Sequence, residues 1–215
     1  MELPLFPLNT VLFPGASLPL HIFEERYKQM INQCLESRSP FGVLLIRSGS
    51  EVRAPAEPFE VGTTASIVHV QRLQEGRLNV VCVGGQRFRV VRTIDDQPYL
   101  VGEVETLASR DEGPQASDRA DTAAALFGEY YRLFLALSGQ WARALGMPGE
   151  PGPLADFIGS RLAVSLWTKQ RLLEELSIGR RLEMEVEILS DAIREMTPRV
   201  QAAQASRWRG FGVMN

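Results

Sequence analysis

The sequence predicts an α+β fold in which a β-rich subdomain, residues 1–110, is followed by a helical bundle subdomain, residues 118–215. Up to about residue 108 the chain consists of short runs of β-branched and aromatic residues separated by Gly and Pro. Beyond Asp118 apolar residues recur at helical spacing instead. Between the two regions, Ser109–Ser117 is polar and contains a Gly-Pro pair, which is typical of a linker or a long surface loop.

Seven short segments of the first region are predicted to be strands, because each carries Val, Ile, Phe or Tyr and ends at turn residues. They are Leu3–Phe13, Ser17–His21, Phe41–Arg47, Gly62–Leu73, Arg77–Val83, Gln86–Arg92 and Tyr99–Glu105. Prolines at positions 7, 14 and 19 each remove a backbone donor, so the first strands are expected to be interrupted or to lie at an edge. These features favour a curled, partly closed barrel over a flat sheet.

One amphipathic helix is predicted within the β-rich region. Apolar residues from Ile22 to Leu35 recur at helical spacing, with charged and amide residues between them. This helix is expected to cover an opening of the barrel. The Pro-rich segment Ser48–Glu60 is predicted to be a protruding loop.

The second region is predicted to contain four helices. The first begins with Asp118 as its cap and runs to about Leu145, and the second opens at Pro153. The third starts at Ser165 or Thr168. Because each helix has one apolar face, the pattern predicts a bundle.

The fourth predicted helix starts around Ile178–Arg180 and carries a seam of apolar residues. Their spacings of 4, 3, 4 and 3 are typical of coiled-coil packing, and the seam consists of Leu182, Val186, Leu189, Ile193 and Met196. Arg181 and Glu185 lie four residues apart, and we expect them to pair on the outer face of the helix.

Composition excludes several classes of partner. The formal net charge is −3, with 11 Lys/Arg against 12 Asp/Glu in residues 1–110 and 12 against 14 in residues 111–215. Neither half therefore has the basic excess of a nucleic-acid-binding domain or an anionic-membrane ligand. No apolar run approaches the roughly 18 residues of a membrane span, and the proline-interrupted N-terminus lacks signal-peptide character. The expected compartment is the cytoplasm.

The sequence offers no pattern for a catalytic, cofactor or metal site, so we expect a protein that is not an enzyme. The two histidines, His21 and His69, have no ligand partners at metal-binding spacing. Neither lysine follows the glycines of a phosphate-binding loop. Cys34 and Cys82 fall on apolar faces and are expected to be buried free thiols. Ser165 and Lys169 have the spacing of a Ser–Lys pair, but helix capping explains them better.

Two further features leave alternatives open. Arg87, Arg89 and Arg92 surround Phe88 and would suit an RNA-binding strand, although nearby glutamates favour an ordinary solvated sheet face. The C-terminal segment Arg207–Asn215 carries two aromatic residues in a basic context. It either packs back on the bundle or forms an arm that contacts a partner.

The opening segment Leu3–Tyr27, LPLFPLNTVLFPGASLPLHIFEERY, resembles the start of the substrate-binding domain of Lon proteases. Further segments match the same family in order along the chain. They are Phe41-Gly42-Val43, Val61-Gly62-Thr63, Gly85 with Phe88-Arg89-Val90, Pro98-Tyr99, Lys169–Glu174 and Arg181-Leu182.

The resemblance implies a β pseudobarrel subdomain related to the PUA fold, followed by a helical subdomain. It also implies recognition of unfolded or damaged polypeptide by a free-standing relative that lacks the ATPase and protease modules. The implied partners are unfolded polypeptide or a protein partner such as a protease or chaperone. The alternative is RNA binding through the PUA-like barrel, which the near-neutral charge of residues 1–110 disfavours; the oligomeric state is left open.

Two binding modes are physically plausible for such a module: strand addition at an exposed barrel edge, and apolar side chains entering a groove between the two subdomains. The candidate peptide-binding residues are Pro14, His21, Phe23, Arg87 and Trp208. For the first four, the competing interpretation is that they set turns and fill the barrel core.

Overall fold

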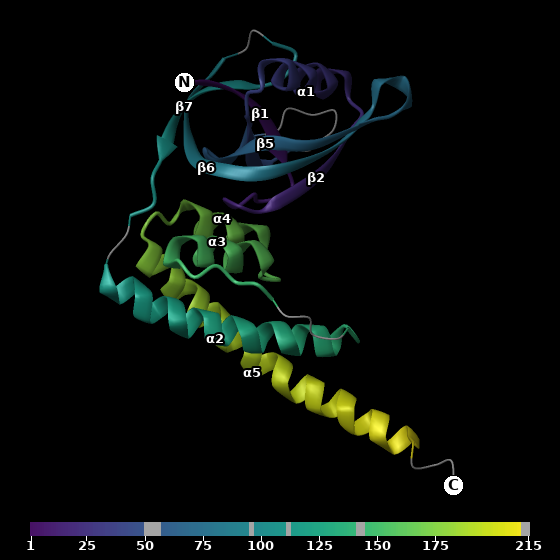
Figure 1. The fold of residues 1–215 in the computed structure, drawn as a ribbon, viewed down its shortest axis with the longest axis vertical. Helices are drawn as coiled ribbons and strands as arrows, with labels where there is room; N and C mark the ends of the chain where they lie inside the picture. Colours follow the sequence, from purple (N-terminus) through teal and green to yellow (C-terminus); the bar gives the residue numbers. More distant parts are fainter. Residues whose placement is uncertain (50–56, 95–96, 111–112, 141–144, 212–215) are drawn as a thin grey trace. The chain divides into compact units, whose positions relative to one another are not determined.

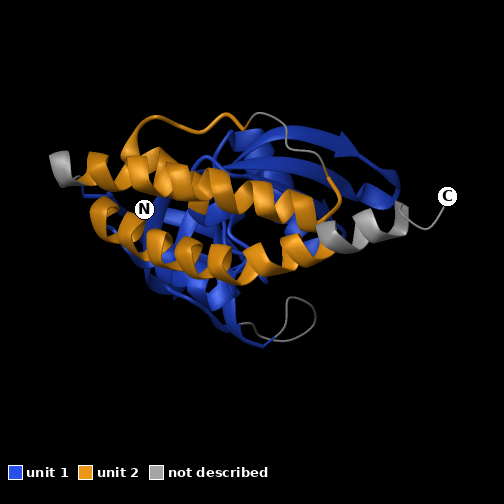
Figure 2. Ribbon diagram, turned by 90° about the horizontal axis from the view of Figure 1, so that it is seen from below, with its two compact units in different colours: residues 1–110, 159–176 blue, residues 111–158, 177–215 orange. Residues whose placement is uncertain are grey.

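The computed structural model describes residues 1–49, 57–94, 97–110, 113–140 and 145–211, without the side chains of residues 114–115 and 204–211. The chain divides into two compact units (Figure 2). The first comprises residues 1–110 and 159–176, and the second comprises residues 111–158 and 177–215. Of the described helices, none is long and apolar enough to cross a membrane.

The first unit is built on a curled sheet (Figure 1). Its seven strands are β1 (Glu2–Leu8), β2 (Ser17–Ile22), β3 (Phe41–Ser48), β4 (Glu57–Pro58), β5 (Val61–Arg72), β6 (Leu78–Ile94) and β7 (Val101–Leu107). The main path runs β1-β7-β6-β5-β3-β4, and β1 also pairs with β3 in parallel. This last pairing closes the path on itself, whereas β2 lies off it and pairs with β6. The predicted α+β class is confirmed.

Strand β6 is longer than the sequence suggests. The segments predicted as two strands, Arg77–Val83 and Gln86–Arg92, form one continuous strand, and the two glycines between them carry the bulge that their sequence suggests. The chain remains paired because Gly84 lets two backbones approach closely: a Cβ there would lie 2.2 Å from the carbonyl oxygen of Phe13. The register of β5 against β6 shifts at this point, as expected for a bulge. A short 3-10 turn, η1 (Gln74–Gly76), joins β5 to β6.

Helix α1 (Glu25–Ser37) is the amphipathic helix predicted within the β-rich region. It begins three residues later than Ile22, because Ile22 is the last residue of β2. Its apolar side packs on the main core of the first unit, through Tyr27, Met30, Ile31 and Cys34. A second core cluster consists of Leu3, Leu5, Leu44, Phe88 and Val104.

Helix α4 (Leu166–Glu174) belongs to the first unit, although its sequence groups it with the helices of residues 118–215. Two buried polar side chains explain the difference. The amide of Gln170 donates to the carbonyl oxygen of Val61 at 3.0 Å. The Nε of Arg87 donates to the carbonyl oxygen of Leu173 at 2.9 Å. The spacing of apolar residues predicts the helix, but it does not predict these hydrogen bonds between the helix and the strands.

The second unit contains α2 (Pro114–Leu137), most of α3 (Pro151–Arg161) and α5 (Ile178–Phe211). Helix α2 begins at Pro114, four residues before the predicted cap, and packs against α5. It ends at Leu137 and not near Leu145, because Gly139 adopts a positive φ of 67° just beyond the C-cap. An aromatic cluster joins α2 to α3: the ring of Phe127 lies 5.8 Å from that of Phe157.

The predicted outer-face pair on α5 is wrong. Arg181 and Glu185 are both fully buried. A guanidinium nitrogen of Arg181 lies 3.6 Å from a carboxylate oxygen of Asp156, which is also buried. The face of α5 that carries Leu182 and Leu189 therefore also carries charged residues, and apolar spacing alone does not reveal them.

Candidate functional site

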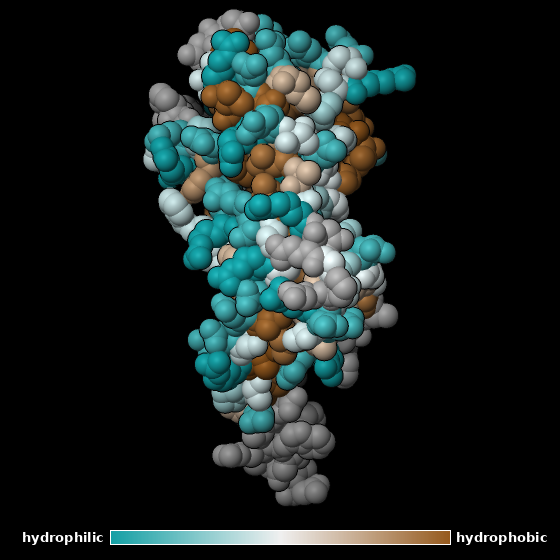
Figure 3. Space-filling view, turned by 90° about the vertical axis from the view of Figure 1, so that its left-hand side faces the viewer, coloured by the Kyte–Doolittle hydropathy of each residue, from teal (hydrophilic) through white to brown (hydrophobic). Residues whose placement is uncertain are grey.

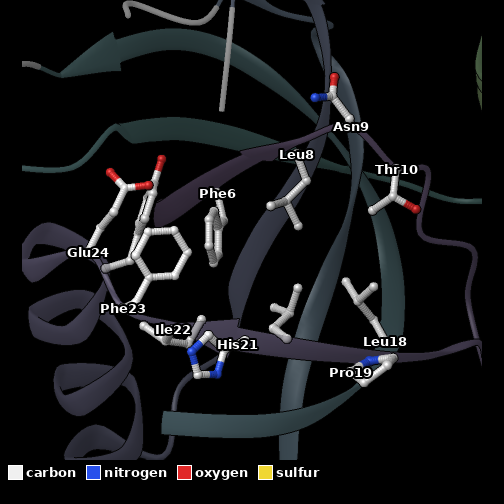
Figure 4. A pocket seen from close by; sticks show the side chains of 12 residues that line it. Phe6, Leu8, Asn9, Thr10, Leu18, Pro19, His21, Ile22, Phe23 and Glu24 are labelled. Atoms are coloured by element: carbon white, nitrogen blue, oxygen red, sulfur yellow. The ribbon is translucent and has the colours of Figure 1, made fainter. Parts of the chain in front are cut away.

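A groove of about 330 Å³ opens beside β2 in the first unit (Figure 4). We call it the β2 groove, and its lining residues are Phe6, Leu8, Asn9, Thr10, Leu18, Pro19, Leu20, His21, Ile22, Phe23, Glu24 and Tyr27. They come from β1 and the segment after it, from β2, and from the start of α1. The groove thus forms within the segment Leu3–Tyr27 that carries the most distinctive sequence motif.

The apolar floor of the groove follows from the alternation of side chains along β2. Successive residues of a strand point to opposite faces, so Leu18, Leu20 and Ile22 share one face. Ile22 is buried, while Leu18 and Leu20 are partly buried against the main core. From the other side, Phe6 and Leu8 point from β1 toward β2 (Figure 4). The groove therefore continues the core of the unit to its surface.

An exposed aromatic side chain stands at the rim of the groove. Phe23 is 51% exposed, and its ring lies 6.0 Å from that of His21 with an interplanar angle of 26°. The ring nitrogen Nδ1 of His21 lies 2.7 Å from Oδ1 of Asn79 on β6, which holds the imidazole in place. A large exposed aromatic beside an apolar groove is typical of a recognition surface.

The groove is close to electrically neutral. Of its twelve described lining residues, Glu24 alone carries a formal charge when His21 is neutral. The Nε of Arg26 donates to a carboxylate oxygen of Glu24 at 3.0 Å, which offsets that charge. The same guanidinium lies 4.5 Å from the ring centroid of Tyr27. Such a lining suits an uncharged, apolar ligand.

The structure brings two of the five sequence-predicted binding residues, His21 and Phe23, to the groove. Pro14 lies half-buried in the turn where the amide of Ala16 donates to the carbonyl of Phe13, and it is not part of the lining. Arg87 is 3% exposed and holds α4, so its side chain is not available at the surface. Trp208 lies in the last part of α5, where its side chain falls outside the described residues.

The chain matches the sequence model of the ATP-dependent protease La (LON) substrate-binding domain over residues 2–191. It belongs to this family. It is 30% identical to a Lon protease of Xanthomonas oryzae over 199 residues, which are 90% of this chain and 23% of that protein. It is 28% identical to a Lon protease of Anaeromyxobacter dehalogenans over 87% of this chain and 23% of that protein. The chain thus spans about a quarter of the length of these relatives.

Solved structures of Lon N-terminal domains have the same fold. A Lon N-terminal domain protein from Xanthomonas campestris superposes with a TM-score of 0.64 at 29% identity, over 85% of this chain and 95% of that one. The N-terminal domain of the Mycobacterium avium complex Lon protease superposes with a TM-score of 0.61 at 21% identity, over 89% and 99% of the two chains. The second likeness shows the fold alone.

Ser165 and Lys169, which have the spacing of a Ser–Lys pair, have structural roles in this Lon-family domain. The hydroxyl of Ser165 accepts a hydrogen bond from the amide of Thr168 at 3.1 Å, which is the N-cap of α4. The ammonium group of Lys169 donates to the carbonyl oxygen of Ser160 at 2.9 Å, and partial burial lowers its pKa. In the part of the chain that is described, no three His, Cys, Asp or Glu side chains gather as metal ligands.

Both cysteine thiols are buried in the main core. Burial raises the pKa of the Cys34 thiol. The pKa of the Cys82 thiol is raised to about 12, mainly by burial and also by the charge of the neighbouring Cys34 in its thiolate form. Since the thiolate is the reactive form, both thiols are held in the unreactive state.

We therefore expect neither thiol to react with a disulfide reagent while the domain is folded. At pH 8 the native protein should show less than about a hundredth of the labelling rate found in 6 M guanidinium, because labelling then requires local opening. The release of the chromogenic thiol from the reagent measures both rates. Raising the pH from 7 to 9 should accelerate labelling of the denatured chain and of the locally opened native chain in the same proportion, so the ratio of the two rates should stay below about a hundredth. Fast native labelling would show that a cysteine is accessible.

Two of the three arginines around Phe88, Arg89 and Arg92, are each paired with a carboxylate. Arg89 lies 3.4 Å from Glu105, and Arg92 lies 2.5 Å from Glu103 on the adjacent strand. The hydrogen bond from Arg92 lowers the pKa of Glu103. On the face drawn in Figure 3, hydrophilic side chains (teal) and apolar ones (brown) are interspersed. The ion pairs of Arg89 and Arg92 with glutamates support the interpretation that this is a solvated sheet face and not an RNA-binding surface.

Proposed function

We propose that this domain recognises protein substrates by binding exposed apolar segments of unfolded polypeptide in the β2 groove. The observation that carries the proposal is a near-neutral apolar groove with a half-exposed aromatic, Phe23, at its rim. Membership of the substrate-binding domain family supports it. In this role the domain performs no chemistry: it captures a client and passes it to a protease or chaperone partner, as an adaptor in protein quality control.

The size of the groove sets the kind of client. At about 330 Å³ it lies near the lower end of ligand sites, which run from roughly 300 to 1,000 Å³. It therefore holds a few side chains of an extended segment. Burial of an apolar side chain contributes about 1.5–3 kcal/mol, and association has a substantial entropic cost. Micromolar affinity, about 8 kcal/mol, is the expected range. Folded proteins hide such side chains, so the groove selects unfolded ones.

The test is the binding of a nine-residue peptide that alternates leucine with threonine and carries a terminal fluorophore, followed by fluorescence anisotropy. Replacement of Phe23 by alanine should weaken binding about five- to thirtyfold, because a rim aromatic typically contributes about 1–2 kcal/mol. The melting temperature should hardly change, since the ring is half exposed.

Two controls make this experiment specific. Trp167 is a 57% exposed aromatic of the same unit that lies outside the groove lining, so Trp167→Ala should leave the affinity within about twofold. A peptide with asparagine in place of leucine should not bind. Absence of peptide binding, together with salt-dependent binding of a structured RNA pool, would contradict the proposal and favour the RNA-binding alternative.

A further inference from the structure

Strand β2 has one unpaired edge within the described residues. It forms an antiparallel ladder with β6, from Ser17 opposite Val83 to Ile22 opposite Leu78. No described strand pairs with its other edge, and that edge borders the β2 groove. A strand edge with unpaired backbone groups is a template for a further strand.

The hydrogen-bonding phase of β2 shows which residues face the open edge. The amide of Gly84 on β6 donates to the carbonyl oxygen of Ala16 at 2.9 Å, and Ala16 is the residue immediately before β2. Along an antiparallel pair, bonded and non-bonded positions alternate. Leu18, Leu20 and Ile22 therefore bond to β6. Their neighbours Ser17, Pro19 and His21 direct their backbone groups away from β6, toward the open edge.

Two observations agree with this phase. Pro19 has no N–H to donate, and the phase places it where β6 requires no donor. His21 lies opposite Asn79 as a non-bonded pair, in which side chains approach more closely. The 2.7 Å separation of their side-chain atoms fits that geometry.

The second half of β1, which also lines the groove, has no described strand paired to the edge opposite β3. Strand β1 pairs with β7 through Glu2, Leu3 and Pro4, and the amide of Leu5 donates to the carbonyl of Leu100. Beyond that point, residues 6–8 pair with β3 and with no other described strand. The groove therefore lies where the described sheet has no strand between β1 and β2.

We propose that the client binds by strand addition: an extended, uncharged segment pairs with the open edge of β2 while every second side chain enters the β2 groove. This rests on the proposed function and specifies its mode. The six residues of β2 span about 20 Å, so five or six client residues are recognised. The client therefore needs apolar side chains at every second position, where they enter the groove. Its intervening side chains point away from the groove and can be polar. Because Pro19 offers no donor, the client's own amides supply much of the pairing.

The decisive probe is the leucine–threonine peptide in two N-methylated forms, one methylated on every leucine amide and the other on every threonine amide. In a strand, alternate amides point to opposite edges, and the leucines that enter the groove fix which set faces β2. One form should lose at least about tenfold in affinity, while the other stays within about threefold of the unmethylated peptide.

A pair of protein variants tests the same bonds from the other side. His21→Pro removes an outward amide at a position equivalent to Pro19, whereas His21→Ala keeps that amide and removes only the imidazole. The proline variant should bind at least about tenfold more weakly than the alanine variant, with similar far-ultraviolet circular dichroism. The methylated peptides need no variant, so the test holds even where His21→Pro does not fold.

The outcomes separate the mode of binding from the function. If the unmethylated peptide does not bind, the proposed function itself fails. If it binds and the two methylated peptides have equal affinity, whether both bind or neither does, strand addition is overturned while peptide binding stands.

Discussion

Replacement of Arg181 by leucine is expected to lower the free energy of unfolding of the second unit by about 3–5 kcal/mol. The guanidinium is fully buried, 3.6 Å from the carboxylate of Asp156, and the buried Glu185 lies one helical turn further along α5. Loss of the cation removes the guanidinium that pairs with the buried carboxylate of Asp156. The cost of an uncompensated buried charge is far larger than the apolar gain from leucine.

Urea denaturation followed by circular dichroism measures this effect, and the adjacent arginine provides the control. The side chain of Arg180 is 57% exposed and pairs with Glu183 at the surface, so Arg180→Leu should change the free energy of unfolding by less than about 1 kcal/mol. Replacing Asp156, Arg181 and Glu185 together by apolar residues of similar volume should recover most of the lost stability. A loss below 1 kcal/mol for Arg181→Leu would show that the cluster is hydrated.

Replacement of Gly62 by alanine is expected to destabilise the first unit by about 3 kcal/mol, at the upper end of the usual cost of overpacking. Gly62 is buried in β5, and a Cβ there would lie 2.2 Å from the carbonyl oxygen of Val43 and 2.6 Å from a methyl carbon of Leu44. The carbonyl belongs to the backbone of β3, so it moves only if the β3–β5 ladder shifts.

The glycine of α2 gives the opposite expectation. A Cβ on Gly128 would meet nothing within 4 Å, and alanine is the better helix former, so Gly128→Ala should raise stability by about 0.5–1 kcal/mol. Thermal and urea unfolding of the two variants measure both changes. Equal, small effects at the two positions would mean that the barrel tolerates a separation of β3 from β5.

Local sequence patterns predicted the elements of this fold well. The strand predicted at Ser17–His21, the helical spacing from Ile22 to Leu35 and the helix start predicted at Ser165 or Thr168 each rest on a few neighbouring residues. The structure has a strand or a helix at all three places, with bounds that differ by a few residues. The errors occur where distant residues decide. β6 continues through Gly84, where the backbone of Phe13 lies too close for a side chain, and α4 joins the strands through hydrogen bonds of Gln170 and Arg87.

The candidate site was only partly predictable for the same reason. His21 and Phe23 were among the predicted binding residues, whereas Leu18 and Leu20 were not. Their exposure to a groove depends on β2 pairing with β6 outside the main path of the sheet. Arg87 looked like a surface cation because strand alternation gives no hint that α4 covers it.

The most direct test of the central claim is to map amide chemical shifts of the ¹⁵N-labelled protein while the leucine–threonine peptide is added. Binding in the β2 groove predicts that the largest shift changes fall on residues 17–23 and 6–10, with little change in α4 and α5. Saturable changes centred on another surface, or no changes at millimolar peptide, would contradict it.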